Sequence, residues 1–374
     1  MPSPAPGDRA TTGHQEIVVL NPGSATIKWA RYASLQSTLA LDSGHQALSH
    51  LDGVMDSLLN KSPRARYVLR FVHGGDQFSG PLRVSRDNAP ALHQLLDWAP
   101  LHNHSSLQCL EKLLVSADSP EIIAVFDTHF FHDLPLAARS YGLPDELVRK
   151  HRIRRYGFHG FAHQAMRDHW EVQWQAGKPY ALITMQLGSG CSMTAIRDGL
   201  PIDTTMGFTP NEGLLMSTRS GDLDPGLLTW LQKREHWSPE QADQVLNRES
   251  GWLGLSAESA DMATLLTSER PESRLAIELF CHRIRKTLGA FYALLGGLDG
   301  IVISGGIGER APGLRWHLFE NLAHLGISLD AERNFEPGPD GRIDVAGAPV
   351  NCQIMAGNES LFMLREAAVL YQDE

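Results

Sequence analysis

Two arginines in glycine-bearing polar segments are the side chains of this sequence best suited to hold an anion. Arg70 precedes the string VHGG at residues 72–75, and Arg219 lies in the polar loop TRSGDLDPG at residues 218–226. A guanidinium is a planar fork that holds a carboxylate or a phosphoryl group through paired hydrogen bonds. Two such forks entering one cleft could hold a carboxylate and a transferring phosphoryl group, whereas a surface salt bridge is the alternative for either arginine alone.

Two glycine-bearing corners could approach a phosphate. The string NPGSATIK at Asn21–Lys28 joins a flexible glycine to amide, hydroxyl and ammonium groups, although an ordinary hairpin turn would have the same composition. The string ISGGIGER at Ile303–Arg310 places three glycines between a predicted buried strand and a helix, where tight packing is the alternative reason for them. Neither G-x-x-x-x-G-K-[ST] nor G-x-G-x-x-G occurs, which excludes the two commonest nucleotide signatures.

Histidines and carboxylates supply the remaining chemistry. His159 stands beside a glycine in the string FHG, and a histidine can donate to a phosphoryl oxygen or act as a general base. His163 follows four residues later, but no H-E-x-x-H string surrounds the pair, so no transition-metal site is predicted. Asp127, after a predicted strand, and Glu359, before the last predicted helix, are better placed for a hard cation such as Mg²⁺. Helix capping or turn formation is the alternative role for both carboxylates.

A repeated strand–corner–strand pattern predicts two copies of one unit. Apolar runs at Ile17–Leu20 and Ile27–Tyr32 flank the first corner. The pattern returns with a strand at Ala181–Leu187, a small-residue corner at Gly188–Ser192 and a strand at Met193–Ile196. We therefore predict a duplicated domain with the two corners facing a cleft, chance similarity of two hairpins being the alternative.

The other patterns alternate between the two kinds of element, which predicts an α/β fold. Strands are predicted at Tyr67–Val72, Ile122–Phe126 and Gly300–Ser304. Helices are predicted at Ala91–Leu96, Leu107–Leu114, Leu275–Leu295, Pro312–Leu325 and Ser360–Gln372, and a turn is predicted at Gly305–Gly308.

Length and composition exclude several classes of protein. A chain of 374 residues is long enough for two domains, and no apolar run approaches the roughly 18 residues of a membrane helix. The Pro- and Thr-bearing N-terminus, residues 1–15, has no apolar core, so it is predicted to be a disordered leader of a cytoplasmic protein. A net charge of −10 disfavours nucleic-acid binding. The four widely spaced cysteines are predicted to be reduced and mostly buried.

Taken in order, eight strings closely resemble motifs of the acetate kinase family. They run from about residue 17 to residue 365: NPGSATIK, RFVHGG, APLHNH, VFDTHFF, RRYGFHG, DTTMGFTPNEGLLMSTRSGDLDPG, SGGIGER and NES. The resemblance implies two duplicated actin-like ATPase (ribonuclease H-like) domains, as in sugar kinases and chaperone ATPases. An N-terminal domain would comprise residues 16–130 plus 360–374, and a C-terminal nucleotide-binding domain residues 131–359.

Carried over by position, the resemblance also implies roles for individual residues. Asn21 and Glu359 would bind the metal, Asp127 would order its water, and Arg70, His159 and Arg219 would act on substrate and phosphoryl group. The acyl pocket would be formed by Val72, Leu101, Phe158 and Pro210. The nucleotide and its phosphates would be bound by Ser24, Thr26, Lys28, Gln186, Gly188, Ser189, Gly190, Asp261, Gly305, Gly306, Ile307, Gly308 and Arg310.

The implied activity is reversible, Mg²⁺-dependent transfer of a phosphoryl group from ATP to acetate, giving acetyl phosphate and ADP, with Mn²⁺ as an alternative ion and a homodimer as the assembly. Four departures from the family pattern fall on the donor side: Gln186 replaces a histidine, Ser189 an asparagine, Ala263 an arginine and Arg310 an asparagine. A propionate or butyrate kinase, a pyrophosphate- or other-nucleotide-dependent variant and a non-catalytic nucleotide-binding scaffold therefore remain as alternatives.

Overall fold

The computed structural model describes residues 15–23, 25–98, 100–174 and 177–371, without the side chains of residues 97 and 100–102. Among these residues the chain forms two compact units. The first comprises the residues up to Gly74, Gly80–Phe126 and those from Ser360 onward; the second comprises Gly75–Ser79 and Asp127–Glu359. The predicted leader, residues 1–15, lies outside the described residues except for Gln15, whose side-chain amide donates to the carbonyl of Arg64 at 2.8 Å.

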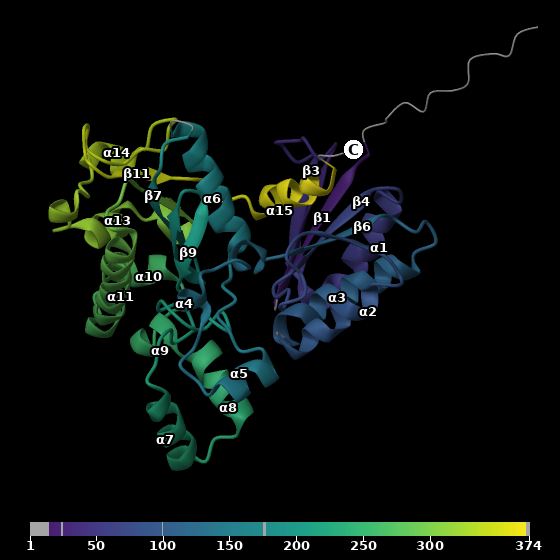
Figure 1. Ribbon diagram of the computed structural model, residues 1–374, viewed down its shortest axis with the longest axis horizontal. Helices are drawn as coiled ribbons and strands as arrows, with labels where there is room; N and C mark the ends of the chain where they lie inside the picture. Colours follow the sequence, from purple (N-terminus) through teal and green to yellow (C-terminus); the bar gives the residue numbers. More distant parts are fainter. Residues whose placement is uncertain (1–14, 24, 99, 175–176, 372–374) are drawn as a thin grey trace, which may run out of the picture. The chain divides into compact units, whose positions relative to one another are not determined.

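The first unit contains a six-stranded mixed sheet and helices (Figure 1). Its strands are β1 (Ile17–Pro22), β2 (Thr26–Tyr32), β3 (Asp42–Ala47), β4 (Arg66–Phe71), β5 (Leu82–Val84) and β6 (Ile122–Phe126). Its helices are α1 (Leu51–Lys61), α2 (Ala89–His93), α3 (Pro100–Val115) and α15 (Glu359–Ala368), with 3-10 turns at Leu48–His50, Gln94–Asp97 and Val369–Tyr371.

The second unit contains a five-stranded sheet and a larger set of helices. Its strands are β7 (Ala181–Leu187), β8 (Cys191–Arg197), β9 (Leu200–Thr204), β10 (Gly300–Ser304) and β11 (Asn351–Ile354). Its helices are α4 (Leu136–Arg139), α5 (Asp145–His151), α6 (Gly160–Gln173), α7 (Pro225–Glu235), α8 (Pro239–Gln244), α9 (Gly251–Ser256), α10 (Met262–Thr267), α11 (Pro271–Leu295), α12 (Gly306–Arg310), α13 (Pro312–Phe319) and α14 (Ala331–Phe335). Short turns of 3-10 helix lie at His129–Phe131 and Ala323–Leu325, and a π-helical turn lies at Val245–Glu249.

The two sheets share one topology. Their strand orders are β3-β2-β1-β4-β6-β5 and β9-β8-β7-β10-β11, so each joins an antiparallel meander to parallel strands on the far side of its first strand. In both units the corner between the first two strands is the glycine-bearing string noted in the sequence. The predicted α/β class and the duplication are therefore confirmed.

Burial explains which strands lie at the centre of each sheet. Every residue of β1, β6 and β10 is buried, because parallel strands covered on both faces require continuous apolar runs. The edge strand β3 is mostly exposed and polar instead. Helix α3 packs on β1 and β4 in the first unit, and α6 packs on β7 and β10 in the second. The four cysteines are all buried and unbridged, as predicted.

Three predicted boundaries near the C-terminal end of the chain are wrong. The predicted turn Gly305–Gly308 is largely helical, because Gly306–Arg310 forms α12. The predicted helix Pro312–Leu325 ends at Phe319, and a separate 3-10 turn follows at Ala323–Leu325. The last helix begins at Glu359 and gives way to a 3-10 turn after Ala368.

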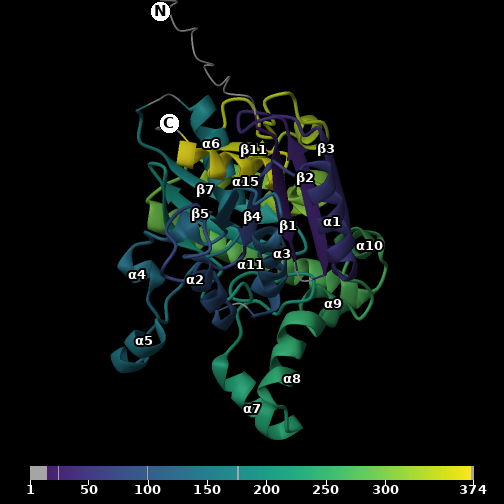
Figure 2. The same cartoon turned by 90° about the vertical axis from the view of Figure 1, so that its right-hand side faces the viewer.

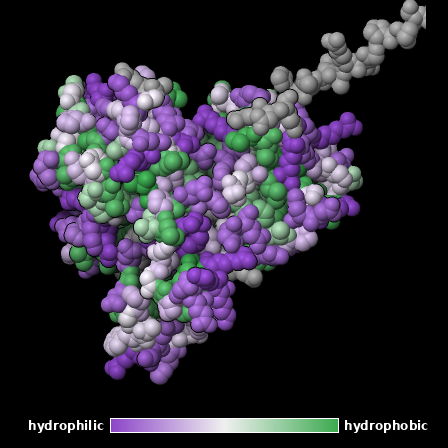
Figure 3. Space-filling view, viewed as in Figure 1, coloured by the Kyte–Doolittle hydropathy of each residue, from purple (hydrophilic) through white to green (hydrophobic). Residues whose placement is uncertain are grey.

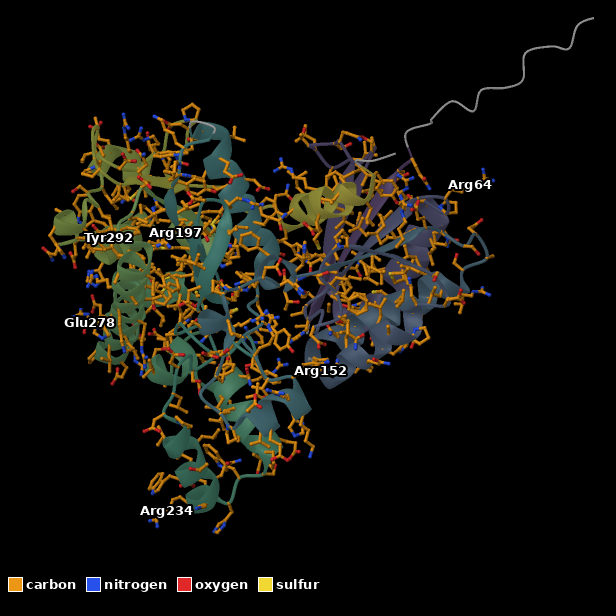
Figure 4. All side chains as sticks on the ribbon, in the orientation of Figure 1. Arg64, Arg152, Arg197, Arg234, Glu278 and Tyr292 are labelled. Carbon is orange, nitrogen blue, oxygen red and sulfur yellow. The ribbon has the colours of Figure 1, made fainter. Side chains whose placement is uncertain are left out.

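Helix α7 has no buried residue, and with α8 it extends away from the sheet of the second unit (Figures 1 and 2). Arg234 lies in the last turn of α7, and Arg152 follows α5 in a left-handed conformation (Figure 4). Hydrophilic residues cover much of the visible surface of each unit (Figure 3). Within the described part of the chain, no helix is both long and apolar enough to cross a membrane.

Candidate active site

In the first unit, the ends of two parallel strands bring Asn21 and Arg70 together. Strands β1 and β4 pair in parallel from Ile17 with Arg66 to Leu20 with Leu69, so the next residues emerge at the same sheet edge. The Asn21 side-chain oxygen accepts a hydrogen bond of 2.7 Å from Nη1 of Arg70. Carboxyl ends of parallel strands are the usual place for ligands in α/β sheets.

The first corner leaves polar groups beside this pair. Gly23 donates to the carbonyl of Thr26 at 2.7 Å, which closes the turn between β1 and β2. Thr26 and Lys28 are exposed, while Ile27 between them is buried, because alternate residues of a strand point to opposite faces. Ser24, predicted to bind phosphate, lies outside the described residues.

Asn103 fixes the segment that carries Val72. Its side-chain oxygen accepts from the backbone N–H of Val72 and of His73 at 3.1 and 3.3 Å, and its amide nitrogen donates to the carbonyls of His73 and Leu95. Asn103 is fully buried, so all these bonds are made away from water. Asn103 belongs to the string APLHNH, and nothing local in the sequence indicated this role. Val72 is buried, whereas the side chain of Leu101 lies outside the described part of the chain.

In the second unit, a close backbone contact joins the Asp127 and His159 segments. The N–H of Gly160 donates to the carbonyl of Asp127 at 3.0 Å. A methyl group at Gly160 would lie 2.0 Å from that carbonyl oxygen, so only glycine permits the approach. His159 itself adopts a left-handed conformation with φ of 59° at the start of α6. Asp127 and Phe158 are both buried.

A chain of hydrogen bonds orients the His159 ring. Ser192 Oγ lies 2.8 Å from His159 Nδ1 and 2.7 Å from His163 Nε2, and His163 Nδ1 lies 2.7 Å from Thr184 Oγ1. Since Ser192 has one hydroxyl hydrogen, at least one of the two rings must donate to it. Burial, together with the nearby His159, holds the pKa of His163 well below its usual value, so His163 is neutral.

His159 and Arg219 converge at Gly190. A methyl group placed on Gly190 would lie 3.3 Å from Cε1 and Nε2 of His159 and 3.8 Å from Nη1 of Arg219. Because Nδ1 of His159 is held by Ser192, its Nε2 edge faces this point. The structure thus brings three predicted site residues together, two of them hydrogen-bond donors suited to one anion.

The Arg219 loop rests on the π-helical turn at 245–249. Ser220 donates to the carbonyl of Leu246 at 3.1 Å, and the Thr218 hydroxyl donates to the carbonyl of Asn247 at 2.8 Å. Burial lowers the pKa of Arg219, and the positive charge of Arg248 lowers it further. Two neighbouring cations favour an anion, and Arg248 is a residue that sequence reasoning missed, since nothing local distinguished it from a surface arginine.

The segment carrying Pro210 is anchored by Glu212. One carboxylate oxygen of Glu212 lies 2.6 Å from Nη2 of Arg155, and the other accepts from the Tyr141 hydroxyl. The Tyr141 oxygen in turn accepts from the N–H of Phe208 at 2.8 Å. Nη1 of Arg219 donates to the carbonyl of Pro210 at 3.2 Å, so the Pro210 and Arg219 segments are joined directly.

A cavity of about 710 Å³ in the second unit is lined by six of the thirteen predicted nucleotide residues. Its size is within the usual range for small-molecule sites. Its lining includes Gly188, Ser189, Asp261, Ala263, Gly306, Ile307 and Arg310. Trp252 and Met262 add apolar surface that sequence reasoning did not assign. The carboxylate of Asp261 also caps α10, accepting from the N–H of Ala263 at 3.2 Å.

Two further predicted nucleotide residues, Gly305 and Gly308, lie where α12 packs on the sheet of the second unit. A methyl group on Gly305 would lie 2.5 Å from the carbonyl oxygen of Leu187 and 3.0 Å from the Gln186 amide nitrogen. A methyl group on Gly308 would lie 2.6 Å from Cγ2 of Ile303. Close packing of α12 on β7 and β10 therefore requires these two glycines, whatever the ligand.

Hard oxygen donors, the ligands that Mg²⁺ prefers, are present at the predicted metal positions. They are the amide oxygen of Asn21 and the carboxylate of Glu359, the first residue of α15. Among the described residues, no group of three or more His, Cys, Asp or Glu side chains is arranged to hold a metal. The chemistry of these oxygen donors fits Mg²⁺ better than a transition metal.

Duplicated sheets of this topology, with a nucleotide-sized cavity in the second unit, define the actin-like ATPase fold. Two solved structures share it across nearly the whole chain. A propionate kinase from Francisella tularensis has a TM-score of 0.86 at 30% identity, covering 94% of this chain and 98% of its own. An acetate kinase from Porphyromonas gingivalis has a TM-score of 0.85 at 26% identity, covering 96% and 100%.

Sequence comparison gives the family. The acetokinase family profile matches residues 16–365. The acetate kinase of Dictyoglomus thermophilum is 40% identical over 321 residues, which is 84% of this chain and 79% of that protein. The chain therefore belongs to the acetokinase family, and it is a phosphotransferase with a carboxyl group as acceptor.

Proposed function

We propose that the protein is an acetate kinase that transfers the γ-phosphoryl group of ATP reversibly to acetate. The observation that carries this proposal is the convergence of His159 and Arg219 at Gly190. Gly190 follows Gly188 and Ser189, which line the cavity assigned to the nucleotide. The names of the relatives, acetate kinase and propionate kinase, support a short carboxylate as acceptor.

The chemistry needs no general base. Acetate has a pKa of roughly 4 to 5, by analogy with side-chain carboxyls, so it is ionised at neutral pH. One of its oxygens attacks the γ-phosphorus in line, the bond to the β-phosphate oxygen breaks, and ADP leaves with that electron pair. Arg70 would hold the acetate carboxylate, while Val72, Leu101, Phe158 and Pro210 would surround its methyl group.

Stabilisation of the transferring group falls to His159 and Arg219. Each presents a nitrogen to the space beside Gly190, where the phosphoryl oxygens would lie, and His159 donates there when Nε2 carries the ring hydrogen. Bound at Asn21 and Glu359, with a water ordered by Asp127, Mg²⁺ would offset the negative charge of the phosphoryl group. Thr26 and Lys28 of the first corner would contact phosphate, and Ser24 would join them.

A nucleotide is the favoured donor because of the cavity. Its volume of about 710 Å³ suits a nucleoside with phosphates, whereas pyrophosphate would leave most of it empty. Trp252, Met262 and Leu266 offer apolar surface to a base. The Arg310 guanidinium lies 2.6 Å from where a methyl group on Gly306 would be. Compared with the family pattern, Arg310 adds a positive charge to the nucleotide side of the site, whereas Gln186 and Ala263 take the places of a histidine and an arginine.

One assay matrix tests this proposal. Purified protein with Mg²⁺ is given ATP, GTP or pyrophosphate, each with acetate, and acyl phosphate is trapped with hydroxylamine. We expect product with ATP and acetate, and loss of product in Arg70→Ala and His159→Ala variants that keep the fold. Absence of acyl phosphate with every donor would refute the proposal. Product with pyrophosphate alone would show that pyrophosphate, not ATP, is the phosphoryl donor.

Propionate is a second candidate acceptor, because a propionate kinase is among the most similar solved structures. One methylene shifts discrimination by only about 10- to 200-fold. A series from acetate to butyrate, compared by kcat/KM, decides between the two. The homodimer stays a prediction from family resemblance, tested by light scattering, and the cytoplasmic location stays a prediction from the N-terminal composition, tested by fractionation.

A further inference from the structure

The Glu309 carboxylate joins two segments that are far apart in the sequence. Its Oε1 accepts from the N–H of Gly305 at 2.8 Å and from the N–H of Gly357 at 3.0 Å. The Ser304 hydroxyl lies 3.5 Å from the same oxygen. One side-chain oxygen thus accepts hydrogen bonds from both backbones.

The hydrogen bond from the N–H of Gly357 to Glu309 is not part of the helix end. Gly305 caps α12, and its bond to Glu309 is an ordinary local contact. Gly357, however, is 48 residues further along the chain. A methyl group there would lie 3.1 Å from Glu309 Oε1 and 3.2 Å from Ser304 Oγ, which is tighter than a side chain normally allows. Glycine at 357 therefore lets this backbone come against the carboxylate.

Each of the two joined segments carries residues of the proposed site. Gly306, Ile307 and Arg310 follow Gly305 directly and line the nucleotide cavity. Glu359, the proposed metal ligand, follows Gly357 by two residues, and two extended residues span at most about 7 Å. Fixing Gly357 thus restricts where the Glu359 carboxylate can lie relative to the cavity.

Resting on the proposed function, we propose that Glu309 is a positioning residue that couples nucleotide binding to the metal ligand Glu359. It holds the glycine-rich loop of the cavity and the Gly357–Glu359 segment in one fixed arrangement. With both segments held, Glu359 would present its carboxylate to a Mg²⁺ ion beside a nucleotide in the cavity without further ordering of either segment. Partners that orient a metal ligand in this way commonly contribute about 10- to 100-fold to metal affinity.

Three variants and one control test the coupling. Glu309→Ala removes the acceptor, and Glu309→Gln keeps an acceptor oxygen without the charge. Gly357→Ala keeps the carboxylate but pushes a methyl group against it, which covers the case that Glu309→Ala fails to fold. Glu332→Ala removes an exposed carboxylate of α14 in the same unit and serves as the matched control.

The first measurement is hydrogen exchange in the protein without ligand. We expect segments 300–310 and 351–359 to exchange faster together in Glu309→Ala and Gly357→Ala, with Glu309→Gln and Glu332→Ala close to wild type. Faster exchange of segment 300–310 alone would show that Glu309 stabilises only its own helix end. That result would overturn the proposal.

The second measurement is ADP affinity by calorimetry, with Mg²⁺ and with EDTA. Glu309→Ala should weaken ADP binding in Mg²⁺ by about 10- to 100-fold. It should change ADP binding little in EDTA, because the variant loses only the link between the nucleotide cavity and the metal ligand Glu359. The KM for acetate should not move, and Glu309→Gln should recover most of the affinity. An equal loss with and without Mg²⁺ would overturn the coupling and leave the proposed function intact. A wild-type protein that neither binds ADP nor forms acyl phosphate would refute the proposed function, and this inference with it.

Discussion

At Gly190 the absence of a side chain leaves room beside two hydrogen-bond donors. Nε2 of His159 and Nη1 of Arg219 would lie 3.3 and 3.8 Å from a methyl group placed there. The sequence indicates a small-residue corner at this position, and a corner alone would accept alanine. The crowding that favours glycine comes instead from the His159 ring, 31 residues earlier in the chain.

Gly190→Ala should therefore impair catalysis more than folding. The added methyl group displaces the His159 ring by a few tenths of an ångström, and misplacement near 1 Å can cost on the order of 100-fold in rate. We expect kcat to fall about 10- to 100-fold, with the thermal midpoint little changed. Gly289→Ala is the matched control, since a methyl group on that exposed glycine of α11 meets nothing within 4 Å. Equal kcat in the two variants would contradict this assignment.

At the scale of elements, His163 connects α6 to the sheet of the second unit. Its ring reaches Thr184 on β7 and Ser192 on β8. The i, i+4 spacing of His159 and His163 resembled a possible metal pair in the sequence. In the structure both rings instead meet one serine hydroxyl, so His163 supports His159.

Replacing His163 should change how stability depends on pH. Its folded pKa is depressed, so below the unfolded value of about 6.5 the unfolded chain binds a proton that the native state does not. Stability is therefore lost as pH falls below about 6.5, by up to about 1.4 kcal/mol per pH unit. Urea unfolding at pH 7.5, 6.5 and 5.5 should give a shallower pH dependence for His163→Gln. The exposed His282→Gln on α11 is the control, and parallel curves for wild type and His163→Gln would contradict the prediction.

Arg315 holds α12 to α14 from within the core. It is almost fully buried, and it donates to the carbonyls of Gly308 and Glu309 at 2.8 and 2.9 Å and to the Asn334 side chain at 2.9 Å. Burial lowers its pKa to about 10, so it stays charged at neutral pH.

Arg315→Met should destabilise the protein, because several buried acceptors lose their donor at about 1–3 kcal/mol each. We expect a loss of at least about 3 kcal/mol in urea unfolding, with a raised KM for the nucleotide and an unchanged KM for acetate. Arg333→Met, an exposed substitution on α14, should have neither effect. A stability loss without any change in nucleotide KM would mean that α12 keeps its position without Arg315.

At the scale of the whole molecule, one topology occurs twice but the two copies have diverged. The first unit presents Asn21 and Arg70 at the ends of β1 and β4. The second unit holds the cavity, His159 and Arg219. In the second unit, Gly188 and Ser189 of the corner line the nucleotide-sized cavity.

Binding of ADP should therefore protect mainly the second unit. ADP with Mg²⁺ at about 100 times its dissociation constant should stabilise the protein by about 2.7 kcal/mol. In hydrogen exchange, protection by ADP should concentrate in residues 181–190 and 260–314, around the cavity. EDTA should abolish acyl phosphate formation while leaving the circular dichroism spectrum unchanged, because the proposed metal is bound with substrate. Loss of the fold in EDTA would show a structural ion instead.

The sequence by itself determined the α/β class, the duplicated hairpins and most strand positions. Those features rest on local patterns, such as buried apolar runs at β1 and β10 and glycines at both corners. Element ends were less well determined, as α12 and α13 show, because glycine and proline permit both a turn and the first turn of a helix. The tertiary structure alone decided which side chains meet: His163 and Ser192 behind His159, Glu309 against Gly357, Arg248 beside Arg219. Such contacts join residues from about 30 to 50 positions apart, and they are chosen by burial and hydrogen bonding in the folded chain, which no local pattern records.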